Sequence, residues 1–344
     1  MISSFPRRRA FLAGALASAL LVVTGCGGSD DSAPSTSGGA ANNGAYPVTI
    51  THKYGSTTIK SAPKRVVTVG LTDQDSLLAL GVVPVGTTEF LGNYPGAIGP
   101  WAQDKLGNAA KPEVLTSTDG PQYEKIAALK PDLILGLYSA LTQEQYDTLS
   151  KIAPVVAQPK EYSDYGIPWQ EETRTVGKVL GKSAQAEQLV SDVEARFAKA
   201  KADNPSFAGA TALVATIYQG YFVYGSEDPR SRVLAELGFT LPGDLDQVIG
   251  NKYGANISAE RTDLLNVKAL VWLVKSEAEG RASLDADKLY SGLDVAKQKR
   301  EVLVPDGTDY GSAMSFVSVL SLPYLLDKLV PQLAAAVDGN PATS

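Results

Sequence analysis

Cysteine and histidine are nearly absent from this sequence of 344 residues, in which Cys26 and His52 are the single residues of their types. One cysteine cannot form an intramolecular disulfide, and zinc sites built from Cys and His are excluded by count. A Ser-His-Asp triad could use only His52, and neither a Gly-x-Ser-x-Gly motif nor a phosphate-binding Gly-x-x-x-x-Gly-Lys-Ser/Thr motif occurs. These absences argue against an enzyme, and we expect His52 to be a surface or edge residue.

Calcium-binding loops are missing as well. Three pairs of aspartates stand two residues apart: Asp73 and Asp75, Asp244 and Asp246, Asp285 and Asp287. None continues into the Asp-x-Asp-x-Asp-Gly pattern of a calcium loop. We therefore expect these aspartates to be helix caps or residues of solvated loops, and we expect no metal site.

Long apolar runs and an excess of basic residues are lacking after residue 25. No later apolar run approaches 18 residues, so no transmembrane helix is expected there. The net charge is −6 for the whole chain and becomes −9 once residues 1–25, which hold three arginines and no acid, are removed. A body of this acidity is a poor nucleic-acid binder, and we expect no nucleic-acid partner.

The N-terminus carries an export signal. A basic segment with Arg8-Arg9 precedes an apolar stretch, Ala13 to Val23, that is too short to span a bilayer. The arginine pair resembles a twin-arginine signal, and Val23-Thr24-Gly25-Cys26 resembles a lipobox. We expect residues 1–25 to be removed and Cys26 to be lipidated, which would anchor the protein to the outer face of the cytoplasmic membrane. Residues 26–45 contain no core-forming residue after Cys26 and are expected to be a flexible tether.

Beyond the tether, short β-branched segments alternate with helical patterns, as in parallel sheets that are covered on both faces. The predicted strands are 66–70, 83–88, 133–138, 155–157, 213–218, 270–274 and 302–304, and predicted helices include 73–80 and 123–129. This alternation predicts two small α/β sandwich lobes with mainly parallel sheets, at 46–166 and 204–338, before a tail at 339–344. Each lobe is long enough to form its own core.

The segment between the predicted lobes, 167–203, has a different pattern. Apolar residues repeat at helical spacing through 169–202, Gly181 interrupts the repeat, and Ser183 is a plausible N-cap for a second helix. That second helix, from 184 to about 202, would be about 28 Å long. The pattern predicts one long, stiff helix where a flexible connection would show extended strands.

Six blocks, in order, resemble the substrate-binding proteins of ABC importers for iron-siderophores and cobalamin. They are Ala-Pro-Lys-Arg-Val-Val at 62–67, Leu-Gly-Val-Val-Pro-Val-Gly at 80–86, Glu-Lys-Ile-Ala-Ala-Leu-Lys-Pro-Asp-Leu-Ile at 124–134, Val-Leu-Ala-Glu-Leu-Gly-Phe at 233–239, Ile-Ser-Ala-Glu at 257–260 and Leu-Pro-Tyr-Leu-Leu-Asp at 322–327. The resemblance implies two lobes joined by one long α-helix, with a ligand cleft between them. It also implies a monomer that binds a ferric-siderophore as ligand and needs no cofactor. Its partners would be an ABC permease dimer and a cytoplasmic ATPase.

The same resemblance implies roles for particular residues. Glu124 and Glu260 match the glutamates, one on each lobe, that dock the permease through arginines. Tyr138, Tyr253 and Tyr310 match positions where ferric-hydroxamate binders place ligand-contacting aromatics. A cleft arginine of those relatives falls at Thr118, so the siderophore class stays open.

Three further ligand contacts are predicted from position and chemistry. Tyr218 ends a predicted strand, where ligands of parallel sheets usually bind. Arg230 is the candidate for the missing cation, and Trp101 is a candidate for the rim of the cleft. A siderophore fills the coordination positions of Fe(III) with its own oxygens, so the protein supplies aromatic and polar surfaces instead of metal ligands.

Other functions remain open at this point. Haem or cobalamin could be the ligand within the same family, although haem would need an axial ligand other than the badly placed His52. In another class, the chain could be an exported hydrolase without a cofactor, since paired carboxylates for glycoside hydrolysis leave no sequence motif to test. It could also be a cell-envelope interaction protein that has kept the fold and lost transport.

We predict that Cys26→Ala leaves the protein folded but releases it from the membrane, because the lipid on Cys26 would be the sole anchor. Cell fractionation of parent and variant measures this. A variant that stays fully in the membrane fraction would contradict the lipid anchor.

Overall fold

The computed structural model describes residues 46–90, 93–250 and 252–339. Cys26, the predicted export signal and the predicted tether lie outside the described residues. No helix of the described residues is long and apolar enough to cross a membrane.

The N-terminal lobe contains a hairpin and a five-stranded sheet in which every neighbouring pair of strands is parallel. The hairpin is β1 (Val48–His52) and β2 (Gly55–Ile59), which pair antiparallel. The order in the sheet is β5-β4-β3-β6-β7. Its strands are β3 (Val66–Thr68), β4 (Gly86–Thr88), β5 (Glu113–Leu115), β6 (Leu133–Gly136) and β7 (Val155–Ala157).

The C-terminal lobe has a mixed sheet of order β10-β9-β8-β11-β12. Its strands are β8 (Ala212–Ile217), β9 (Tyr221–Tyr224), β10 (Gly254–Ile257), β11 (Ala269–Val274) and β12 (Glu301–Pro305). Strands β8, β11 and β12 run parallel, whereas β9 is antiparallel to both of its neighbours. The predicted fold class, α/β lobes with mainly parallel sheets, is confirmed, and the seven predicted strands are all present.

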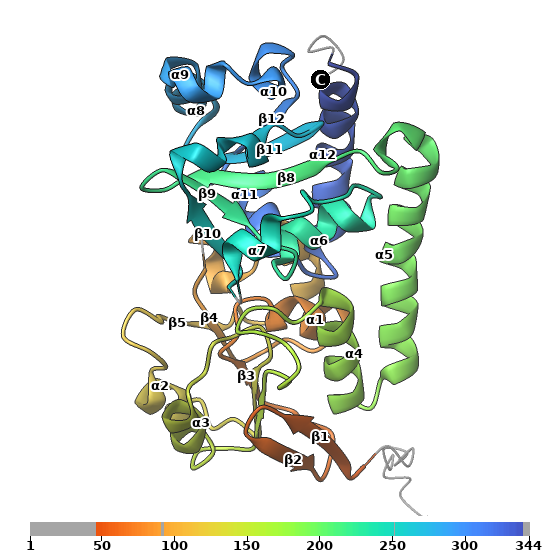
Figure 1. Cartoon of the computed structure of the whole chain (residues 1–344). Helices are drawn as coiled ribbons and strands as arrows, with labels where there is room; N and C mark the ends of the chain where they lie inside the picture. Colours follow the sequence, from red (N-terminus) through yellow and green to blue (C-terminus); the bar gives the residue numbers. More distant parts are fainter. Residues whose placement is uncertain (1–45, 91–92, 251, 340–344) are drawn as a thin grey trace, which may run out of the picture. The chain divides into compact units, whose positions relative to one another are not determined.

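Helices surround both sheets (Figure 1). The α-helices are α1 (Asp73–Ala79), α2 (Tyr123–Ala128), α3 (Gln143–Leu149), α4 (Trp169–Val179), α5 (Ser183–Asp203), α6 (Pro229–Glu236), α7 (Leu245–Ile249), α8 (Glu277–Ala286), α9 (Lys288–Ser291), α10 (Asp294–Lys297), α11 (Asp309–Ser315) and α12 (Ser321–Asp338). The 3-10 helices are η1 (Pro95–Ala97), η2 (Pro100–Leu106), η3 (Pro205–Phe207) and η4 (Ala259–Leu265).

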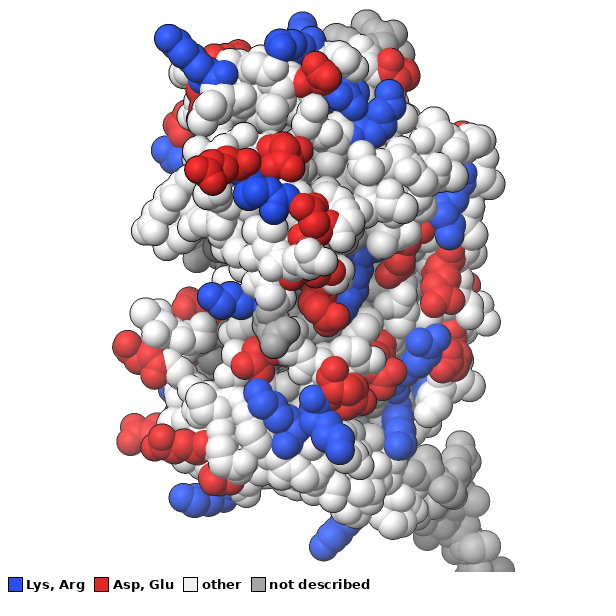
Figure 2. All heavy atoms as spheres, in the orientation of Figure 1, with Lys and Arg blue, Asp and Glu red and all other residues white. Residues whose placement is uncertain are grey.

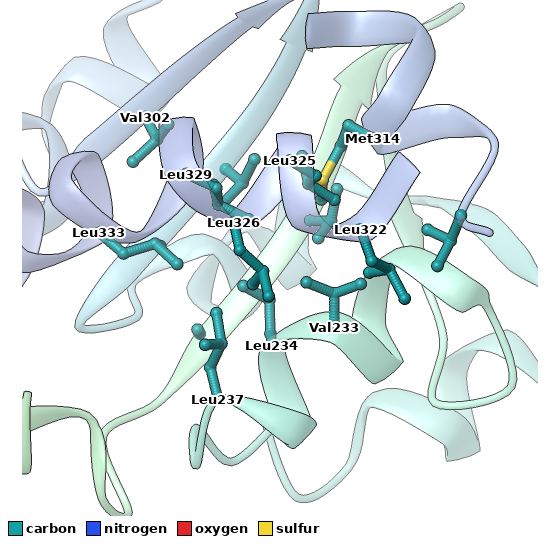
Figure 3. Packing of buried hydrophobic residues seen from close by; sticks show 14 of the residues in the cluster. Val233, Leu234, Leu237, Val302, Met314, Leu322, Leu325, Leu326, Leu329 and Leu333 are labelled. Carbon is teal, nitrogen blue, oxygen red and sulfur yellow. The ribbon is translucent and has the colours of Figure 1, made fainter. Parts of the chain in front are cut away.

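Burial on both faces explains the continuous apolar strands. In β11, Leu270 and Trp272 belong to one hydrophobic core, and Val271 and Leu273 belong to the core on the opposite face. Successive side chains of a strand point to opposite faces, so a strand covered on both sides must be apolar at every position. Figure 3 shows one of these cores, in which leucines of α12 face Val233 and Leu234 of α6 and Leu237, the C-cap residue of that helix.

The helices α4 and α5 meet at a turn that the sequence located at Gly181. Gly181 has a φ of 67°, and its N–H donates to the Lys178 carbonyl while the Lys182 N–H donates to the Gly177 carbonyl. These two hydrogen bonds form a Schellman motif. The motif favours glycine because it requires one residue in the left-handed backbone conformation. Lys182 is the N-cap of α5 and Ser183 is its first residue, so the predicted N-cap was wrong by one position.

Helix α5 connects the cores of the two lobes. Near its start, Ala186 lies in a core with side chains of β3 and β6. Further along, Val190, Val193 and Phe197 lie in a core with side chains of β8 and α12. Its 21 residues correspond to about 31 Å. The predicted long connecting helix is confirmed, while the exact lobe boundaries at 46–166, 167–203 and 204–338 stay predictions.

Candidate ligand-binding site

A pocket of about 200 Å³ is lined by residues from both lobes. The N-terminal lobe contributes Leu71, Tyr138 and Tyr165, and the C-terminal lobe contributes Asp228, Arg230, Tyr253, Ser315 and Phe316. Three tyrosines and one phenylalanine therefore surround a single arginine and aspartate. A concave apolar surface with a few polar groups is typical of sites for small organic ligands.

Tyr138 is positioned by a buried carboxylate. The N–H groups of Leu137 and Tyr138 donate to the two carboxylate oxygens of Asp73, at 2.9 and 3.0 Å. Strand β6 ends at Gly136, two residues before the predicted strand end, so both residues bound by Asp73 follow the strand. The Tyr138 ring, 6% exposed, meets the Tyr165 ring edge to face with 5.6 Å between centroids. Burial raises the pKa of Tyr138, so its hydroxyl stays protonated and can donate to a ligand oxygen.

Arg230 and Asp228 form a buried ion pair at the start of α6. Nη1 of Arg230 donates to both carboxylate oxygens of Asp228, at 2.9 and 3.1 Å, and the Asp228 carboxylate also caps α6 by accepting from the Arg230 backbone N–H. The guanidinium lies over the Tyr224 ring, 4.4 Å from its centroid. Burial alone would lower the pKa of Arg230, but the adjacent Asp228 carboxylate reverses the effect, and the pKa is raised.

A second pocket of about 150 Å³ in the N-terminal lobe shares Leu71 and Tyr165 with the first. It lies beyond the carboxyl ends of β3, β4 and β5, where parallel sheets usually bind ligands. Its polar lining consists of uncharged hydroxyl and amide side chains, from Thr88, Thr116, Ser117, Gln122, Ser139 and Gln145. The two pockets together offer aromatic faces and neutral hydrogen-bonding groups.

The structure brings three of the six predicted ligand contacts to the first pocket: Tyr138, Tyr253 and Arg230. The other three lie elsewhere. Tyr218 is 61% exposed at the turn between β8 and β9, and Tyr310 is buried in α11 with no hydrogen-bond partner for its hydroxyl among the described residues. Trp101 packs against Tyr94 and Tyr324 and lines neither pocket. Their contact with a ligand stays a prediction.

Sequence reasoning missed Tyr165 and Phe316. Tyr165 lies outside the helices and strands and Phe316 is the C-cap residue of α11, so only their aromatic character could have drawn attention to them. Tyr165 has a φ of 58°, which turns its ring back toward Tyr138, and Phe316 follows α11 and packs against Phe90 at 5.0 Å between centroids. Binding residues often lie in loops that a rigid scaffold positions. The conformation of such a loop cannot be predicted from the residues next to it in the sequence.

A buried carboxylate also joins the two lobes near this site. Asp75 of α1 accepts hydrogen bonds from the Trp101 indole at 2.7 Å and from the Ser318 hydroxyl, which belongs to the segment between α11 and α12. Burial raises the pKa of Asp75 to about 6, although both hydrogen bonds lower it. The expectation that Asp73 and Asp75 lie in caps or solvated loops was wrong, because both are buried and accept hydrogen bonds from groups distant in sequence.

The buried acids extend to Glu172 of α4. Its carboxylate accepts from the Thr72 hydroxyl at 2.8 Å, and its other oxygen has no hydrogen-bond partner among the described residues. Burial and the nearby Asp73 raise the pKa of Glu172 well above its ordinary value. No group of three or more His, Cys, Asp or Glu side chains in the described part of the chain is arranged to hold a metal ion.

His52 was expected at the surface or at a strand edge; it lies in β1 of the two-stranded hairpin, and its side chain is buried, so the surface position was wrong. Its Nε2 lies 3.0 Å from the Thr57 hydroxyl, its Nδ1 accepts from the Tyr54 N–H, and its ring contacts Tyr146. Burial lowers the pKa of His52, which favours the neutral ring. His52 lines neither pocket.

Glu124 and Glu260 are both exposed and stand in the first turn of a helix, α2 in the N-terminal lobe and η4 in the C-terminal lobe. Neither takes part in the ion pairs found among the described residues. Figure 2 shows basic and acidic side chains interspersed over one face of the molecule, so this face has no extended basic area for a nucleic-acid backbone.

Two α/β lobes tied by one long helix, with a pocket lined from both, define a bilobed solute-binding protein. The chain belongs to the periplasmic binding protein family, whose profile matches residues 66–306. This is a family of solute-binding proteins and not of enzymes, and the family predicted from the sequence is confirmed.

Individual relatives cover most of the chain. The putative ABC transporter substrate-binding lipoprotein YhfQ of Bacillus subtilis is 26% identical over 282 residues, covering 76% of this chain and 82% of the relative. The crystal structure of a periplasmic solute binding protein from Mycobacterium smegmatis has a TM-score of 0.74 at 34% identity, covering 84% of this chain and 98% of that chain. The complex of Streptococcus pneumoniae PiaA with ferrichrome has a TM-score of 0.75 at 28% identity, covering 85% and 99%.

The buried position of Asp75 generates a prediction about stability. Folding raises the pKa of this carboxyl from 3.8 to about 6, so the folded protein binds more protons than the unfolded protein between these values. The contribution of Asp75 to the free energy of unfolding therefore falls as the pH rises through this interval. Between about pH 4 and about pH 7.5, the free energy of unfolding should fall further in the parent than in Asp75→Asn. We expect the difference between the two falls to be up to about 3 kcal/mol.

Urea denaturation of parent and variant at both pH values measures this difference. The matched control is Asp104→Asn, which removes an exposed acid from η2, the helix that carries Trp101. Its pH profile should follow the parent. Identical profiles for Asp75→Asn and the parent would contradict a raised pKa for the buried Asp75 carboxyl.

Proposed function

We propose that this chain captures a ferric siderophore outside the cytoplasmic membrane and delivers it to the permease dimer of an ABC importer, which a cytoplasmic ATPase drives. The observation that carries the proposal is the pocket in which Tyr138 and Tyr165 of one lobe face Tyr253 and Phe316 of the other. A siderophore satisfies the coordination of its own iron, so the binding protein must cover an organic shell with aromatic faces and offer hydrogen bonds to its oxygens.

Relatedness supports this substrate. The PiaA structure, similar over 85% of this chain, is a complex with ferrichrome. YhfQ is a putative ABC transporter substrate-binding lipoprotein, which supports the lipid anchor at Cys26 and an extracytoplasmic location. We propose export by the twin-arginine route from the Arg8-Arg9 pair.

We predict that the protein binds at least one ferric siderophore and that Tyr138→Ala or Tyr253→Ala lowers the affinity about tenfold, because each change removes an aromatic face of the pocket. Intrinsic tryptophan fluorescence or isothermal calorimetry measures the affinity. A protein that binds none of a panel of hydroxamate, catecholate and carboxylate chelates would contradict the proposal. A Soret band on titration with haem would point to haem as the ligand instead.

Tyr218→Ala is the matched control. Tyr218 and Tyr253 are the two most exposed tyrosines among the described residues, at 61% and 51%, and of these two Tyr253 lines the pocket. An unchanged affinity for Tyr218→Ala would confine the ligand to the pocket. A loss as large as that of Tyr253→Ala would extend the site to the turn between β8 and β9.

Docking generates a separate prediction about transport. Glu124 and Glu260 are exposed on different lobes, so each can pair with an arginine of one permease subunit. We expect the Glu124→Ala, Glu260→Ala double variant to bind the chelate as the parent does and to fail in uptake. Losing one member of a buried interfacial charge pair costs about 2–5 kcal/mol per pair.

Radioactive iron uptake in cells, together with the binding assay, tests this role. The control is a Glu144→Ala, Glu277→Ala double variant, which also removes one exposed first-turn acid from each lobe. The control should transport normally. Normal uptake by the Glu124 and Glu260 variant would reject docking, and lost binding would place these glutamates in the ligand site.

A further inference from the structure

The charged groups of the candidate site cancel one another. Among the described residues that line the two pockets, the charged side chains are Asp228 and Arg230. They form an ion pair of 2.9 Å, and their side chains are 3% and 15% exposed. Water therefore screens the pair weakly, and the Asp228 carboxylate already neutralises the positive charge of Arg230 when no ligand is bound.

Arg230 has further partners that occupy its charge. Its guanidinium covers the Tyr224 ring, and its Nη1 atom donates to both oxygens of Asp228. The charge of Arg230 also affects a second carboxylate, that of Asp306. Burial raises the pKa of Asp306, and the positive charge of Arg230 opposes this rise. Because Asp228 is paired with it, the guanidinium of Arg230 leaves no unbalanced positive charge at the pocket.

The remaining polar lining is neutral. Thr116, Ser117, Gln122 and Ser139 offer hydroxyl and amide groups, and Tyr138 and Tyr253 offer phenol hydroxyls. Such groups can solvate the oxygens of a ligand without adding charge. Moving a polyanionic ligand from water into a site without a compensating cation is strongly unfavourable, whereas an uncharged ligand loses little solvation.

From these charges, and resting on the proposed function, we infer that the site selects ferric chelates of zero net charge and that Asp228 determines this selectivity by neutralising Arg230. Three hydroxamates, each with a single negative charge, neutralise Fe(III). Three catecholates, each with two negative charges, leave a strongly anionic complex. The site therefore takes an uncharged trihydroxamate chelate and rejects a tris-catecholate chelate.

The test compares two ferric chelates that differ in net charge. Ferrichrome is an uncharged trihydroxamate, and ferric enterobactin is an anionic tris-catecholate. Isothermal calorimetry on the parent should show ferrichrome binding at least about 100-fold more tightly. Asp228→Asn keeps the shape of the side chain and leaves Arg230 with an unbalanced charge. It should improve the affinity for ferric enterobactin about tenfold and leave that for ferrichrome within about threefold.

Asp244→Asn is the matched control. Asp244 also pairs with an arginine, Arg261, and stands at the N-cap of α7, but it lines neither pocket. The substitution changes the net charge of the protein by the same amount. It should alter neither affinity, so a change shared by both variants would assign the effect to overall charge and overturn the role of Asp228.

The outcomes separate the inference from the proposed function. Tighter binding of ferric enterobactin by the parent would overturn the charge selectivity and leave a siderophore-binding protein. Binding of neither chelate, nor of any other ferric siderophore, would overturn the proposed function. If Asp228→Asn does not fold by circular dichroism, the salt dependence of the parent decides. An affinity of the parent for ferric enterobactin that does not weaken from low to high ionic strength supports a site without excess positive charge, because only such an excess would attract the anionic chelate, and a steep fall contradicts it.

Discussion

Helix α5 contributes side chains to hydrophobic cores in both lobes, and the geometry of the candidate site depends on this shared packing. Ala186 lies in the core beside β3 and β6, whereas Val190, Val193 and Phe197 lie in the core beside β8 and α12. Protein cores are close-packed, so neither lobe can slide along the helix without opening a cavity. The packing of α5 in both cores thereby limits how far the tyrosines of the two lobes can move apart.

Polar contacts reinforce this connection at two other places. Asp75 joins α1 to Ser318, and Glu236 of α6 accepts from the Trp169 indole and from Gln170 of α4. A buried carboxylate that loses its donors is costly, so these contacts resist separation of the lobes. The lobes are thus connected by a helix, by the segment before α12 and by hydrogen bonds, which favours small adjustments over a wide hinge motion.

The sequence predicted those parts of the structure that are encoded by local pattern. Strands buried on both faces, such as β6 and β11, are continuous apolar runs, and the break at Gly181 follows from its left-handed conformation. Strand β10 was missed because it is a short edge strand with small and polar residues, whereas β9, an interior strand, was missed although its residues favour strands. Short edge strands owe their structure to their neighbours more than to intrinsic propensity.

The candidate site was harder to predict because it is assembled from loops and pairings distant in sequence. Tyr138 and Tyr253 could be proposed from the family resemblance, and Arg230 from its charge. The neutralisation of Arg230 could not, since a sequence shows that Asp228 is near but not that both side chains are buried together. In the same way, Asp73 reads as an ordinary first-turn acid until its hydrogen bonds to Leu137 and Tyr138 are seen.

The distribution of charge separates the two tasks that we propose for the molecule. The pockets hold a balanced ion pair and neutral groups, while Glu124 and Glu260 stand exposed in the first turns of helices on different lobes. Exposed carboxylates keep their hydration until a cationic partner arrives, so they can direct docking without disturbing a neutral ligand inside. Because α5 fixes the lobes to each other, the two glutamates keep a nearly constant spacing. A two-subunit permease that recognises this spacing would therefore distinguish the ligand-bound form by small structural changes around the pocket. The docking surface itself would not need a large rearrangement.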